Sequence, residues 1–108
     1  MTHTGRDTID VTVHGDTTKA AVAGDFDMRA TFTVEPALEG ALDRPGLSAL
    51  EVDLSRLRFI DSTGIGVLVR VEAEARERGV ALTILPAPPE VQRIFSATGV
   101  ADALPFRD

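Results

Sequence analysis

Two kinds of hydrophobic periodicity alternate along this chain, and their order limits the possible folds more than any other feature. Apolar and polar residues alternate over residues 8–14, which predicts a half-buried strand, and the turn signal Gly15-Asp16 joins it to a second strand that ends at Gly24. Helix-like spacings of three and four then recur between further strand-like runs, so the predicted order is β-β-α-β-α-β-α. A hairpin pairs antiparallel, whereas strands connected through a helix pair in parallel. The sequence therefore predicts an α/β fold, a mixed β-sheet covered by helices.

A proline sets the predicted start of the first helix. Pro36 has no backbone N–H and fits best in a first helical turn, so this helix is predicted to start around Val34 and to end near Leu42. Residues 28–33 would then form an irregular segment or a separate turn.

The remaining elements are predicted from alternation, apolar runs and helix-ending glycines. They are a strand at residues 50–54, a loop at 56–60, a helix at about 63–78, a strand at 80–85 and a helix from Pro89 that stops at Gly99. Residues 100–104 could add one further turn. The polar residues 1–7 are predicted to be a flexible N-terminus, which leaves residues 8–108 as a single domain.

Charge and composition argue against several classes of function. The formal net charge is −6, from 17 acidic and 11 basic residues, which disfavours binding to nucleic acid or to an anionic membrane through a basic surface. The absence of cysteine excludes disulfides, thiolate metal sites and cysteine nucleophiles, and it fits a cytoplasmic protein. No apolar run reaches the roughly 20 residues that a membrane span needs. We therefore expect a cytoplasmic protein that is not an enzyme and uses neither a metal nor a cofactor.

The most unusual segment is residues 59–68, Phe-Ile-Asp-Ser-Thr-Gly-Ile-Gly-Val-Leu. It begins a predicted helix with three residue types that can accept hydrogen bonds from the first free N–H groups of a helix. These three are Asp61, Ser62 and Thr63. Gly64 and Gly66 follow, and each glycine disfavours a helix by up to about 1 kcal/mol relative to alanine. A glycine placed at this point suggests that something approaches the backbone closely.

Spacing alone leaves several interpretations of this segment open. The simplest is structural, a helix cap followed by glycines that permit tight packing. A phosphate-binding loop is disfavoured because the Walker pattern and its lysine are missing. A serine hydrolase is disfavoured because the first glycine of a nucleophile elbow is missing and a catalytic triad would have to use His3 or His14.

The segment closely resembles the central motif of the STAS domain in bacterial anti-sigma-factor antagonists. That motif is an aromatic or apolar pair, then Asp-Ser-Ser/Thr-Gly-Leu/Ile-Gly, then an apolar helix. Gly24-Asp25-Phe26-Asp27 resembles the second signature of the family, a Gly-Glu-Leu-Asp-like tetrapeptide after the second strand. The resemblance covers residues 9–106 and implies a STAS-like fold. The chain departs from the family pattern at Asp25-Phe26, where Glu-Leu is more usual, and at Pro36 in the first helix.

The resemblance implies a function for the serine motif. Family members bind an anti-sigma factor that is also a serine protein kinase, which frees the sigma factor; the kinase phosphorylates the first hydroxyl of the motif and a phosphatase resets it. Here the matching acceptor is Ser62, with Asp27 close to it. The partner-binding residues implied are Asp27, Asp61, Ser62, Thr63, Gly64, Ile65 and Gly66. The alternative is a STAS domain that serves as a structural or regulatory subunit of a transporter, lipid-transfer or stress-signalling complex, with Ser62 only a cap.

Overall fold

The computed structural model describes residues 8–107, so the predicted flexible N-terminus at residues 1–7 lies outside the described residues. A sheet of four strands runs in the order β1-β2-β3-β4, with β1 Ile9–His14, β2 Thr17–Phe26, β3 Ala49–Ile60 and β4 Ala81–Leu85. β1 and β2 are antiparallel, and β2–β3 and β3–β4 are parallel. The helices are α1 Met28–Leu42, α2 Ser62–Glu77 and α3 Pro89–Thr98, followed by the short 3-10 helix η1 Ala101–Ala103. The predicted mixed sheet and the order β-β-α-β-α-β-α are confirmed.

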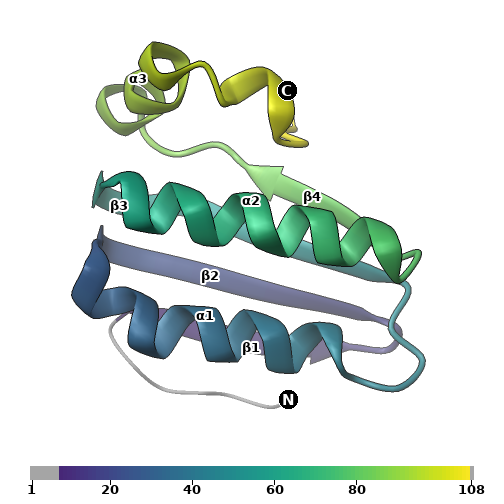
Figure 1. Ribbon diagram of the computed structural model, residues 1–108. Helices are drawn as coiled ribbons and strands as arrows, with labels where there is room; N and C mark the ends of the chain where they lie inside the picture. The colour runs from purple at the N-terminus through teal and green to yellow at the C-terminus, as the bar shows by residue number, and fades with distance from the viewer. Residues whose placement is uncertain (1–7, 108) are drawn as a thin grey trace.

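Helices α1 and α2 lie side by side on one face of the sheet (Figure 1). The C-terminal segment runs along the outer edge of β4. There the N–H of Ile84 donates to the carbonyl of Pro105 at 3.0 Å, and the N–H of Arg107 donates to the carbonyl of Ile84 at 2.8 Å. These bonds satisfy backbone groups that an open edge strand would leave free.

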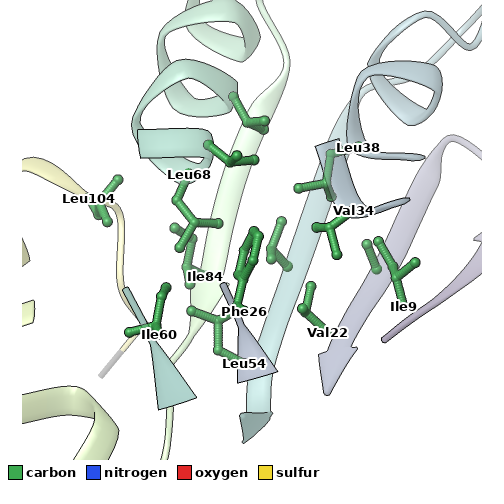
Figure 2. Close-up of a cluster of buried hydrophobic side chains, with 14 of the residues drawn as sticks. Ile9, Val22, Phe26, Val34, Leu38, Leu54, Ile60, Leu68, Ile84 and Leu104 are labelled. Carbon is green, nitrogen blue, oxygen red and sulfur yellow. The ribbon is translucent and has the colours of Figure 1, made fainter. Parts of the chain in front are cut away.

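The core fills the space between these two helices and the sheet, and it extends to α3, where Val91 and Phe95 are buried. Figure 2 shows Phe26 pointing from β2 into this space, between Leu68 of α2 and Val34 and Leu38 of α1. Phe26 is fully buried, and burying a side chain of this size stabilises a fold by about 1.5–3 kcal/mol. The last residue of β2 therefore anchors both helices.

Strand β3 is longer than predicted, and the predicted loop at residues 56–60 is wrong. The pairing with β2 continues to its end, where Phe26 lies opposite Ile60. Two register shifts, between Ala21 and Ala23 and between Gly24 and Asp25, insert extra residues into β3. Such bulges break the alternation of period two, so that Leu54, Leu57 and Ile60 are buried at intervals of three. Without the alternation typical of a strand, the sequence pattern of residues 56–60 indicated a loop.

Helix α1 begins at Met28, so the predicted start around Val34 is also wrong. The carboxylate of Asp27 accepts a hydrogen bond from the N–H of Ala30 at 3.0 Å, which starts the helix before the proline. Pro36 lies within the helix on its exposed side. An internal proline costs about 3 kcal/mol or more. Burial of one side of the helix offsets that cost, because its apolar residues pack onto the sheet.

Candidate functional site

The serine motif lies where two parallel strands end next to each other. Phe26 and Ile60 are paired residues at the C-terminal ends of β2 and β3. Asp27 and Asp61 therefore leave the sheet side by side, at the ends of these two strands. The N–H of Asp61 donates to the carbonyl of Phe26 at 3.3 Å, which ties the two chain segments together. Each aspartate is followed by a helix, and both helices begin at the left end of the sheet in Figure 1.

Both aspartates act as helix N-caps. The Oδ1 atom of Asp61 accepts hydrogen bonds from the N–H of Thr63 at 2.9 Å and from the N–H of Gly64 at 3.1 Å. Asp27 caps α1 in the same way through Ala30. An N-cap of this kind contributes about 0.5–2 kcal/mol to stability. Of the three residues able to cap α2, the structure uses Asp61.

Ser62 is the first residue of α2, and its side chain is exposed. Within residues 8–107 its hydroxyl group forms no hydrogen bond, because Asp61 already satisfies the helix start. Thr63, which carries the neighbouring hydroxyl, is only partly exposed. Of the two residues that carry a hydroxyl group, Ser62 is therefore the more exposed.

The two glycines of the motif have different environments. A Cβ atom at Gly64 would lie 2.4 Å from the carbonyl oxygen of Phe26 and 2.9 Å from the Ile60 side chain, so no larger residue fits there without a backbone shift. A Cβ atom at Gly66 would meet only the Nη1 atom of Arg70 at 3.3 Å, the end of a flexible side chain. The fold requires a glycine at position 64 and does not require one at position 66.

Some of the predicted partner-binding residues are accessible at the surface, and the others are buried beneath them. Asp27, Asp61, Ser62, Thr63 and Gly66 are at least partly accessible, whereas Gly64 and Ile65 are buried. The buried pair faces the core, so it holds the first turn of α2 in place. A role of these seven residues in partner binding stays a prediction.

Sequence reasoning missed two exposed apolar side chains beside this site. Met28 and Phe32, one turn apart on α1, are 63% and 78% exposed. They line a surface hollow of about 500 Å³ together with Asp27, Arg29 and Asp61. Apolar residues at positions i and i+4 away from the buried face would have indicated this surface, but the predicted helix started too late to include them.

The histidines do not complete a hydrolase site in the part of the chain that the structure describes. His14 pairs with Thr17 at the start of β2, while Ser62 follows the opposite end of the sheet. The ten residues of β2 separate the two ends by about 30 Å. His3 lies outside the described residues. A triad of Ser62 with His14 is therefore excluded by distance.

Neither a metal centre nor a membrane span is found within residues 8–107. No group of three His, Cys, Asp or Glu side chains in this region could hold a metal ion. None of its helices is long and apolar enough to cross a bilayer. The chemistry that the described site offers is that of an exposed hydroxyl beside two capping carboxylates.

Comparison with known proteins gives a family for this arrangement. Residues 9–105 match the family described as Mlab, STAS domain. The anti-sigma-B factor antagonist of Listeria monocytogenes is 31% identical over 87 residues, which are 81% of this chain and 75% of the relative.

Two solved structures share the fold. The anti-sigma factor antagonist SpoIIAA in its unphosphorylated form superimposes with a TM-score of 0.77 at 20% identity, covering 94% of this chain and 87% of that one. The Bacillus cell fate determinant SpoIIAA in its phosphorylated form gives a TM-score of 0.72 at 19% identity, covering 94% and 90%. From the family match and the Listeria relative, the chain belongs to the STAS domain family of anti-sigma-factor antagonists.

Proposed function

We propose that this chain binds an anti-sigma factor with serine kinase activity, frees the sigma factor, and is switched off when the kinase phosphorylates Ser62. A phosphatase then resets the switch. The observation that carries the proposal is the exposed Ser62 hydroxyl, which the Asp61 cap leaves without a structural task. The Listeria relative is named an anti-sigma-B factor antagonist, and SpoIIAA is described in both unphosphorylated and phosphorylated forms, which supports the proposal.

The position of Ser62 suits a modification that leaves the fold intact. A phosphate group adds about −1.5 to −2 charges and three acceptor oxygens. At the first residue of α2 it meets the positive end of the helix dipole, which favours an anion by about 0.3–1 kcal/mol. Because the hydroxyl makes no hydrogen bond within residues 8–107, none is lost when it is esterified.

The same position makes recognition sensitive to the modification. The phosphate would stand next to Asp61, with Asp27 on the neighbouring segment, on a chain of net charge −6. A partner surface that fits the neutral hydroxyl would have to bury or repel this added charge. Mismatched or like charges at an interface can cost several kcal/mol. Phosphorylation is therefore expected to weaken binding much more than it changes stability.

Intact-mass measurement tests the proposal. The chain is incubated with ATP and, one at a time, with the purified anti-sigma factor kinases encoded in the same genome. We expect one kinase to add a single phosphate, the Ser62→Ala variant to accept none, and the Thr63→Val variant to be modified like the wild type. Phosphate mapped to Thr63 would contradict the switch at Ser62. A chain that no kinase binds or modifies would favour the alternative, a STAS subunit of a larger complex.

A further inference from the structure

The first two turns of α1 present an apolar surface that the fold itself does not use. Met28 and Phe32 project from the same side of the helix, 63% and 78% exposed, whereas the core-facing side of α1 carries Ala30, Val34 and Leu38. Neither exposed side chain packs against the core cluster. Phenylalanine and methionine are enriched at protein interfaces relative to the rest of the surface.

This apolar surface extends to the residue that precedes the switch serine. The hollow of about 500 Å³ next to Met28 and Phe32 reaches across to Asp61, the residue that immediately precedes Ser62. A group seated in the hollow would thus lie beside the first turn of α2. A single partner surface could cover both α1 and the Ser62 hydroxyl.

The charges around the hollow define what it accepts. Asp27 and Asp61 both line it, and each uses only its Oδ1 atom for capping within residues 8–107. Two carboxylate oxygens therefore remain as acceptors, with Arg29 as the cation in the lining. The hollow suits an apolar side chain whose neighbours donate hydrogen bonds and carry no negative charge.

We propose that Met28 and Phe32 anchor the anti-sigma factor by holding one of its apolar side chains in this hollow, which extends the contact surface from Ser62 onto α1. The inference rests on the proposed function. The anchor would also explain why phosphorylation of Ser62 weakens binding. An apolar anchor excludes water from the neighbouring surface, and a phosphate on Ser62 would lose hydration there without gaining a partner for its charge.

Calorimetric titration of the purified anti-sigma factor kinases tests the anchor. The wild-type chain is first titrated with each kinase to find the partner, and Ser62→Asp is titrated next to check the switch. Phe32→Ala and Met28→Ala are then compared with Phe59→Ala. Phe59 is a matched control because it is an apolar side chain, 45% exposed on β3, that does not line the hollow.

We expect Phe32→Ala to weaken binding by about tenfold or more, Met28→Ala to weaken it in the same direction, and Phe59→Ala to stay within about twofold of wild type. Melting curves of all three variants should match the wild type, since these side chains are exposed. Suppose that the wild type binds a kinase and that Ser62→Asp no longer does. The anchor alone is then wrong if both α1 variants bind like the wild type, or if Phe59→Ala weakens binding as much as they do. If the wild type binds no kinase, the proposed function and the anchor fall together.

Discussion

A Cβ atom at Gly64 would lie 2.4 Å from the carbonyl oxygen of Phe26, so the first turn of α2 rests directly on the end of β2. The same carbonyl accepts the N–H of Asp61 at 3.3 Å. The close approach of Gly64 to Phe26 and this hydrogen bond fix the height at which α2 starts above the sheet. They also determine where the Ser62 side chain emerges.

Replacing Gly64 by alanine should destabilise the fold. We expect the Gly64→Ala variant to lose about 1–3 kcal/mol of unfolding free energy, because overpacking outweighs the gain in helix propensity of up to about 1 kcal/mol. Gly66→Ala is the matched control and should be neutral or slightly stabilising, since its Cβ would meet only the terminal Nη1 of Arg70, which can shift without moving the backbone. Urea denaturation of both variants measures the difference. Equal stabilities would show that the close approach to Phe26 does not constrain residue 64.

The two residues at the start of α2 should differ in their effect on stability. Asp61→Ala removes the acceptor of two N–H groups, so the unfolding free energy should fall by about 0.5–2 kcal/mol. Ser62→Ala removes no hydrogen bond within residues 8–107 and should change it by less than about 0.5 kcal/mol. Denaturation curves of the two variants measure this. If Ser62→Ala lowered the unfolding free energy as much as Asp61→Ala, Ser62 would be a capping residue of α2.

The second half of β3 should behave as part of the core. Leu57 is 2% exposed, so Leu57→Ala should lower the unfolding free energy by about 2–5 kcal/mol. Arg56→Ala, at an exposed neighbouring position, should change it by no more than about 0.5 kcal/mol. Thermal or chemical unfolding distinguishes the two. A small effect at Leu57 would mean that this segment is the loop that its sequence pattern suggests.

A chelator should not change the stability of the protein. Residues 8–107 hold no cluster of ligating side chains, so a bound metal is not expected to contribute to folding. Melting curves recorded with and without a chelator should superimpose. A lowered melting temperature with the chelator would reveal an ion that stabilises the native state by mass action.

The sequence predicted the features that depend on local patterns. The opening hairpin, the later parallel pairs and the helix after the serine motif followed from periodicity, and the motif itself was located by its residues. The start of α1 was missed because Pro36 is a strong local signal, whereas the Asp27 cap and the burial of Ala30 extend the helix ahead of that proline. The end of β3 was missed because two bulges, set by pairing with β2, remove the alternation.

The candidate site was predicted only in part, because some of its features depend on tertiary structure. The sequence named Asp61, Ser62 and Thr63 together as capping residues, and only the three-dimensional arrangement distinguishes the cap from the exposed hydroxyl. That Asp27 lies close to Ser62 was implied only by the family resemblance. The pairing of β2 with β3 brings Asp27 next to the serine motif, and strand pairing cannot be read from a local sequence pattern. Exposed residues such as Phe32 carry no periodic signal once the helix start is misplaced.

The most direct test of the switch compares Ser62→Ala with Ser62→Asp in binding to the anti-sigma factor kinase. Alanine keeps the surface small and neutral, so this variant should bind like the wild type and can no longer be switched off. Aspartate places a second negative charge beside Asp61, so it should bind about tenfold or more weakly, although it carries less charge than a phosphate. It should fold at least as well as the alanine variant, because the dipole of α2 favours an anion at its first residue.

Calorimetric titration, paired with melting curves, measures both properties at once. We expect the aspartate variant to be at least as stable as the alanine variant and to bind the kinase much more weakly. Equal binding of the two folded variants would contradict a switch at Ser62.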